Sequence, residues 1–131
     1  MLPSLCDGES VFVVRTRFKW NILRRGDVVA FQQSGGIYIK RVIGLPGEDI
    51  KIIGSNVYIN GLPLTEAYTQ GISGVQDNEW FNGLDEYFLL GDNRGDSTDS
   101  RTFGSVSSDL IIGRAWFLCW PPFRWRPLAI R

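Results

Sequence analysis

The sequence contains no histidine, and only two of its 131 residues are cysteines. Without histidine, base catalysis would have to use a lysine or a carboxylate. Cys6 and Cys119 belong to no C-x-x-C pair, so a structural zinc site is not expected. The two cysteines are compatible with one disulfide or with two separate thiols. The size of the chain favours the thiols, because a domain of this length needs no covalent staple.

Net charge and long apolar runs are also absent. The 14 basic and 14 acidic side chains cancel, which argues against a protein that binds nucleic acid through phosphate contacts. No segment reaches the roughly 18 consecutive apolar residues that span a bilayer. Hydrophobic residues make up 44% of the chain, so we expect a single globular domain over residues 1–131.

Short apolar segments separated by turn residues predict a mainly β fold with little helix. Residues 65–84 show little periodicity and are expected to form a long loop. Trp116, near the C-terminus, is expected to end a core strand. Many short strands joined by turns indicate a closed or coiled antiparallel sheet. The expected strands cover residues 11–15, 28–32, 36–44, 50–53, 57–59, 86–90 and 110–120.

Lys40 lies inside the apolar strand expected over residues 36–44. Strand alternation places Lys40 on the same face as Tyr38, and it places Ile39 and Arg41 on the other face. A lysine becomes a usable base only when burial lowers its pKa by several units from about 10.4. The alternative is a lysine that extends from a strand edge into water, and periodicity alone favours this alternative.

Residues 91–101, with the sequence GDNRGDSTDSR, concentrate charged and hydroxyl side chains. An ordinary polar turn is the interpretation that composition favours. A calcium loop would use Asp92, Asn93, Asp96 and Asp99 as oxygen ligands, but the spacing is not that of an EF-hand. A third interpretation is a buried scaffold of Asp–Arg pairs beside a catalytic group.

Four segments in order, residues 1–5, 25–31, 40–48 and 91–101, resemble the sequence boxes of type I signal peptidases. These are membrane-bound Ser/Lys endopeptidases that remove signal peptides from exported preproteins. The resemblance implies a coiled antiparallel, barrel-like β-domain of the signal peptidase I type. It also implies a location at the cell membrane, with the domain on the extracytoplasmic side. No metal or cofactor is implied, and the expected partners are signal peptides and the membrane surface.

The resemblance also implies a role for particular residues. Lys40 corresponds to the general base, and Ser97 to the serine that orients it. A scaffold for the loop is expected from Asp92, Asp99 and Arg101. Shallow apolar pockets for small substrate side chains are expected to be lined by Met1, Leu5, Tyr38 and Ile39.

One departure from the family pattern concerns the nucleophile. In the family's first box the nucleophilic serine immediately precedes the position of Met1, and Ser4 aligns with a different position of that box. We therefore expect the sequence as written to be an N-terminally truncated, inactive form that lacks the serine and the membrane anchor. The alternatives are a non-catalytic β-domain that binds extended peptides and, more distantly, a self-cleaving repressor domain with Ser/Lys chemistry.

Overall fold

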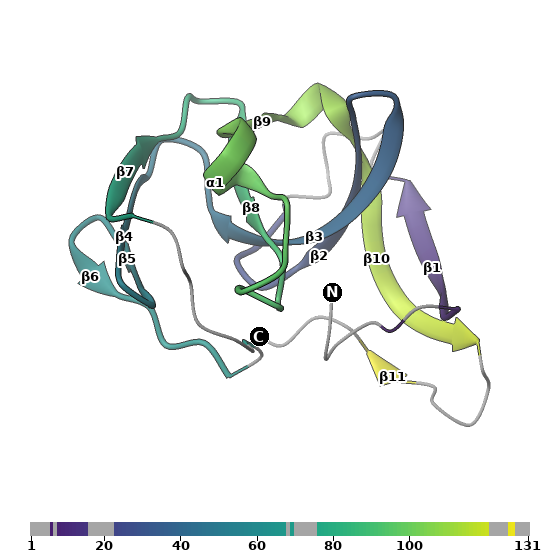
Figure 1. Ribbon diagram of the computed structural model, residues 1–131. Helices are drawn as coiled ribbons and strands as arrows, with labels where there is room; N and C mark the ends of the chain where they lie inside the picture. Colours follow the sequence, from purple (N-terminus) through teal and green to yellow (C-terminus); the bar gives the residue numbers. More distant parts are fainter. Residues whose placement is uncertain are drawn as a thin grey trace.

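The structure is a computed structural model that describes residues 6, 8–15, 23–67, 69, 76–120 and 126–127. These residues form eleven strands and two short helical turns (Figure 1). The helical turns are α1 (Ser100–Phe103) and η1 (Ser108–Leu110). The strands are β1 (Ser10–Arg15), β2 (Val28–Gln33), β3 (Gly36–Gly44), β4 (Asp49–Ile53), β5 (Asn56–Ile59), β6 (Leu62–Pro63), β7 (Asn78–Phe81), β8 (Glu86–Leu90), β9 (Val106–Ser107), β10 (Ile111–Trp120) and β11 (Arg126–Pro127).

The strands pair antiparallel in two sheets. The larger sheet has the order β1-β10-β2-β3-β8-β9, with β11 paired to β10, and the smaller sheet has the order β6-β5-β4-β7. In Figure 1 the long curved strands β2, β3 and β10 form the centre of the larger sheet, and β4 to β7 lie together at the left. The expected mainly β, coiled antiparallel fold is confirmed, and the sheets of the described residues are open rather than closed into a barrel.

The β2–β3 hairpin sets the position of Lys40. Its turn contains Ser34 at φ 46° and Gly35 at φ 79°, as a tight two-residue hairpin turn requires. From this turn the strands pair without a register shift, so that Val29 lies opposite Lys40. Because the turn fixes the register, it also fixes which face of β3 each side chain occupies.

A β-bulge at the end of β3 carries the chain toward the smaller sheet. Val42 lies opposite Leu89 and Gly44 opposite Phe88, so Ile43 is the extra residue on the bulged strand. Gly44 has no room for a side chain, because a Cβ there would lie 2.7 Å from Ile50 Cδ1. The bulge thus depends on glycine at position 44.

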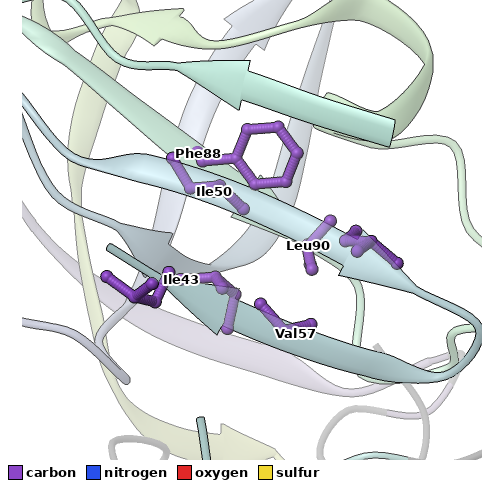
Figure 2. Packing of buried hydrophobic residues seen from close by; sticks show 7 residues of the cluster. Ile43, Ile50, Val57, Phe88 and Leu90 are labelled. Atoms are coloured by element: carbon purple, nitrogen blue, oxygen red, sulfur yellow. The ribbon is translucent and has the colours of Figure 1, made fainter. Parts of the chain in front are cut away.

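Two hydrophobic clusters form most of the core, one on each side of β8. Phe88 and Leu90 point toward the smaller sheet, while Leu89 points the other way. Figure 2 shows the cluster between the sheets, made of Ile43, Ile50, Ile52, Val57, Ile59, Phe88 and Leu90. The cluster on the other face consists of Leu23, Val29, Phe31, Val42, Leu89 and Val106.

Two expectations from the sequence were wrong. Residues 65–84 do not form one long loop, because β7 lies within them and pairs with β4. Trp116 does not end a core strand, since it is 55% exposed on β10. Among the described residues, no helix has the length and apolar character needed to cross a membrane.

The bulge gives a test of the fold. We expect Gly44→Ala to destabilise the protein by about 1–3 kcal/mol, because the new methyl group would press on Ile50 and on Phe88 Cβ, 2.8 Å away. Denaturant unfolding would measure the change. Gly36→Ala is the matched control, since its Cβ would come no closer than 3.4 Å to Tyr38. Equal effects of both substitutions would contradict this account of the bulge.

Candidate functional site

The turn that contains Arg25, Gly26 and Asp27 packs against the end of β3. The Gly26 amide donates to the Val42 carbonyl at 2.9 Å, and the Val42 amide donates to the Asp27 carbonyl at 2.8 Å. The Arg25 guanidinium binds both carboxylate oxygens of Glu48, at 2.8 and 2.7 Å. Two of the sequence segments that carry the resemblance are therefore in direct contact.

A fully buried ion pair joins β3 to the loop of residues 91–99. Arg41 Nε and Nη2 each donate to one carboxylate oxygen of Asp92 at 2.8 Å, and both side chains have no exposed surface. Arg41 Nη1 donates to the Gly26 carbonyl at 2.8 Å. The pair thus connects three segments that are far apart in the sequence, and its bidentate geometry leaves little freedom in their placement.

A second buried ion pair, between Asp99 and Arg101, holds the loop together from within. Arg101 Nε and Nη2 donate to the two Asp99 oxygens at 2.8 and 2.9 Å. Asp99 also accepts from the Gly91 amide at 3.0 Å, and its side chain caps α1. Ser100 Oγ accepts from the Leu89 amide at 2.9 Å, which fixes α1 to β8.

Lys40 contacts this loop through Ser97. Lys40 Nζ donates to Ser97 Oγ at 2.9 Å, and both residues are half-buried. Gly91 lies directly beside the pair, because a Cβ at Gly91 would lie 2.1 Å from Ser97 Oγ and 3.5 Å from Lys40 Nζ. A residue with any side chain at position 91 would therefore displace Ser97.

The pKa values of Lys40 and Asp99 are both lowered. Burial has the largest effect and lowers the pKa of Lys40. The carboxylates of Asp99, Asp92 and Asp96 raise this pKa, and the charge of Arg101 lowers it further. Burial alone would raise the pKa of Asp99, but the hydrogen bonds and charge of Arg101, the Gly91 amide and Ser97 together lower it. The site therefore favours a carboxylate at Asp99 and eases proton loss from Lys40.

The hydroxyl of Ser97 lies between these two groups. Its nearness to the carboxylate is the smallest of the effects that lower the pKa of Asp99. Ser97 Oγ accepts the hydrogen bond from Lys40 Nζ, so one of its lone pairs faces the amine. A neutral lysine amine that donates to Ser97 keeps its own lone pair for another proton.

Arg94 holds the other side of the loop. Its Nε donates to the Gly91 carbonyl at 2.9 Å, and its carbonyl accepts from Arg101 Nη1 at 2.8 Å. Glu66, from the segment after β6, binds the Arg94 guanidinium with both carboxylate oxygens. Nothing in the local sequence around Glu66 indicates this contact.

The structure brings together most of the residues that the resemblance selected. Lys40, Ser97, Asp99 and Arg101 form one cluster, while Asp92 binds Arg41, a residue to which sequence reasoning gave no partner. Tyr38 lies on the Lys40 side of β3, 41% exposed, with its ring 6.1 Å from that of Phe31. Ile39 packs on the opposite face, against the cluster of Val28 and Ala115.

Some expected residues lie outside the described part of the chain. Met1 and Leu5, expected to line the substrate pockets, are among them, and so is Ser4. The side chain of Cys119 also lies outside it, so the state of the two cysteines stays a prediction.

The contacts of the loop disfavour the calcium interpretation. Two of the four expected ligands, Asp92 and Asp99, are bound to arginine guanidinium groups. The described residues contain no group of three or more His, Cys, Asp or Glu side chains placed to hold a metal ion. The loop instead matches the third interpretation, a scaffold of Asp–Arg pairs beside Lys40.

Comparison with known proteins gives a consistent family. The family model described as "Signal peptidase, peptidase S26" matches residues 1–120. Signal peptidase I of Leptolyngbya laminosa is 40% identical over 131 residues, which cover 92% of this chain and 64% of that protein. Signal peptidase IB of Staphylococcus aureus is 33% identical over 140 residues, which cover 92% of this chain and 73% of that protein.

A solved structure agrees with these relatives. The crystal structure of a signal peptidase I from Enterococcus faecalis is 34% identical to this chain, with a TM-score of 0.61. The match covers 72% of this chain and 97% of that one. The chain spans 64% of the length of the Leptolyngbya relative and 59% of a probable signal peptidase I-2 from Synechocystis.

The buried carboxylate at the centre of the loop gives a test of the site's electrostatics. Since the folded-state pKa of Asp99 lies below its ordinary value of 3.8, its contribution to stability is present above about pH 4 and is lost as the pH falls through the folded value. We expect Asp99→Asn to lower the free energy of unfolding at neutral pH by about 1–3 kcal/mol and to flatten its decline in acid.

Denaturant unfolding at a series of pH values would measure both effects. The matched control is Asp96→Asn, which removes an exposed carboxylate from the same loop. An acid decline as steep in Asp99→Asn as in the unsubstituted protein would contradict the assignment.

Proposed function

We propose, because the chain belongs to the signal peptidase family (peptidase S26), that the intact protein cleaves signal peptides from exported preproteins, with Lys40 as general base. The observation that carries the proposal is the hydrogen bond of 2.9 Å between Lys40 Nζ and Ser97 Oγ in a half-buried site. By the family resemblance, the nucleophile is a serine at the position that precedes Met1. The 131 residues then supply the base and its scaffold and need that serine for turnover.

The chemistry would proceed in two steps. Neutral Lys40 takes the proton of the serine hydroxyl while the serine oxygen attacks the scissile carbonyl. The C–N bond then breaks, the leaving amine receives the proton from Lys40, and an acyl-enzyme remains. In the second step Lys40 takes a proton from water, whose oxygen attacks the ester and releases the signal peptide with a free carboxylate. Lys40 returns the proton to the serine, so the cycle needs no cofactor.

The substrate would bind as an added strand along β3. Strand β8 pairs with β3 only from Arg41 to Gly44, whereas β2 pairs with β3 from Gly36 to Arg41. The β8 side of the preceding residues of β3 is thus where an extended peptide could pair next to Lys40. Tyr38 is 41% exposed and Ile37 67% exposed, which supports apolar contact with such a peptide. The domain would then lie at the extracytoplasmic face of the cell membrane, where exported preproteins emerge.

A second candidate function uses the same edge without catalysis. A β-domain that captures extended peptides would need the open side of β3 but not a lysine of lowered pKa. The lowered pKa of Lys40, which burial causes, favours the peptidase. Only the peptidase requires the Lys40 amine, so a substitution of Lys40 distinguishes the two functions.

We expect Lys40→Ala to abolish cleavage in the full-length protein, because no other group would accept the serine proton, while the fold and peptide binding are kept. A preprotein cleavage assay, circular dichroism and a peptide-binding assay would measure the three properties. Lys51→Ala on β4 is the matched control, since Lys51 is exposed on the smaller sheet. Cleavage by Lys40→Ala near the unsubstituted rate would exclude the lysine as base.

The charge state of the base also predicts a pH dependence. Cleavage should rise with pH as Lys40 loses its proton, and the midpoint should lie below 10.5 because burial lowers the pKa of Lys40. Asp96→Asn should move this midpoint to lower pH, because the Asp96 carboxylate raises the pKa of Lys40. Initial rates across the pH range would measure the shift.

Asp109→Asn, at η1, is the control for that shift, because Asp109 is not among the charges that act on Lys40. A midpoint that Asp96→Asn leaves in place, or moves upward, would contradict the assignment of this limb of the pH profile to Lys40.

A further inference from the structure

The contact between Glu66 and Arg94 joins two parts of the molecule that the sheet ladders leave separate. Glu66 follows β6 of the smaller sheet, and Arg94 lies in the loop after β8 of the larger sheet. Arg94 Nη1 donates to Glu66 Oε2 at 3.0 Å, and Nη2 donates to Oε1. Only 6% of the Arg94 side chain and 7% of the Glu66 side chain are exposed, so the pair is nearly dry.

Arg94 in turn fixes the Gly91 peptide group, which lies beside Ser97. Its Nε donates to the Gly91 carbonyl, while the Gly91 amide donates to Asp99. Arg101 binds both Asp99 and the Arg94 carbonyl. The hydrogen bonds form a closed ring that begins and ends at Gly91, and Glu66 binds this ring from outside.

We propose that Glu66 is a positioning residue of the peptidase: through Arg94 it holds Gly91 in place, and so keeps Ser97 Oγ at hydrogen-bond distance from Lys40 Nζ. The inference rests on the proposed function for its effect on cleavage. Its structural part, the placement of Ser97 against Lys40, can be measured without any cleavage.

The physical argument starts from the buried guanidinium. Without the Glu66 carboxylate, Arg94 would be a buried cation that has lost its bidentate partner, and its interaction with water would draw it outward. The Gly91 carbonyl would then lose its donor. Gly91 and Ser97 are packed so closely that a Cβ on Gly91 would lie 2.1 Å from Ser97 Oγ, so a displaced Gly91 carries Ser97 with it.

The charge state of Lys40 reports on this displacement. The charged groups that act on Lys40 are Asp99, Arg101, Asp92 and Asp96. The three carboxylates belong to the loop that Arg94 holds, and Arg101, in α1, binds the Arg94 carbonyl. Opposite Lys40, on β2, lies the apolar Val29. A loosened loop admits water to Lys40 and weakens the desolvation that lowers its pKa.

The first experiment compares Glu66→Gln with the unsubstituted full-length protein. We expect kcat at neutral pH to fall by roughly tenfold, since small misplacements of catalytic groups cost up to about a hundredfold. KM should stay within about twofold, because Glu66 is not on the β3 edge proposed for the substrate. The rise of kcat with pH should move to higher pH, so that the deficit shrinks in alkali.

Glu48→Gln is the matched control. Glu48 makes the same bidentate pair with an arginine, Arg25, but this pair joins the turn after β3 to the Arg25–Asp27 turn, not to the loop that contains Gly91. It should lower stability and leave the pH profile in place. A Glu66→Gln profile identical to the unsubstituted one would overturn the inference, and so would a uniform fall of kcat at every pH.

The second experiment needs no activity. Carbon-13 NMR titration of Lys40 in the folded protein should give a higher pKa in Glu66→Gln than in the unsubstituted protein and in Glu48→Gln. An unchanged Lys40 pKa would overturn the inference whatever the cleavage assay shows. If the unsubstituted full-length protein does not cleave preproteins but the Lys40 pKa rises in Glu66→Gln, the proposed function fails and the positioning role stands.

Discussion

The buried ion pair between Arg41 and Asp92 is the interaction on which the rest of the site depends. Both side chains are withdrawn completely from water, and the pair is stabilised by its bidentate geometry and by the hydrogen bond from Arg41 Nη1 to the Gly26 carbonyl. Such a pair tolerates little misalignment, because a shifted partner leaves a buried charge unmatched. It therefore specifies how the Arg25–Asp27 turn, strand β3 and the loop after β8 fit together.

The placement of Lys40 follows from that of Arg41. The two residues are neighbours on β3, and the alternation of a strand sends adjacent side chains to opposite faces. With Arg41 fixed in the ion pair, Lys40 must face the side on which Ser97 and Asp99 lie. One residue thus holds the loop to the sheet, and the next presents its amine to that loop. The two basic residues are adjacent in the sequence because Arg41 binds Asp92 on one face of β3 and Lys40 contacts Ser97 on the other.

Most of the strands and the face of Lys40 could be predicted from the sequence, because alternation and turn residues act over short distances. The residues of the loop cluster were selected only by the resemblance to signal peptidases, since composition alone favoured an ordinary polar turn. The sequence did not reveal that Asp92 binds Arg41 or that Glu66 binds Arg94. Such pairs depend on which strands become neighbours, and no local pattern carries that information. The helical turn α1 is shorter than the period that would reveal it, and β7 has only four residues, of which the first two, Asn78 and Glu79, are typical of loops. Trp116 lies at a register shift between β1 and β10, where Phe12 pairs with Phe117 and Val13 with Ala115, and its exposure could not be predicted from alternation along the strand.

The lowered pKa of Lys40 has a consequence for the energetics of the whole domain. In the unfolded chain this lysine is an ordinary ammonium group, whereas in the folded protein burial makes its charge costly. Folding near neutral pH must therefore either expel a proton or bury a charge, and both oppose the native state until the pH exceeds the unfolded value of 10.5. The residue proposed as the general base thus lowers the stability of the domain, and the hydrophobic clusters on either side of β8 offset this loss. A variant that is more stable at this position would therefore be one that lacks the Lys40 amine.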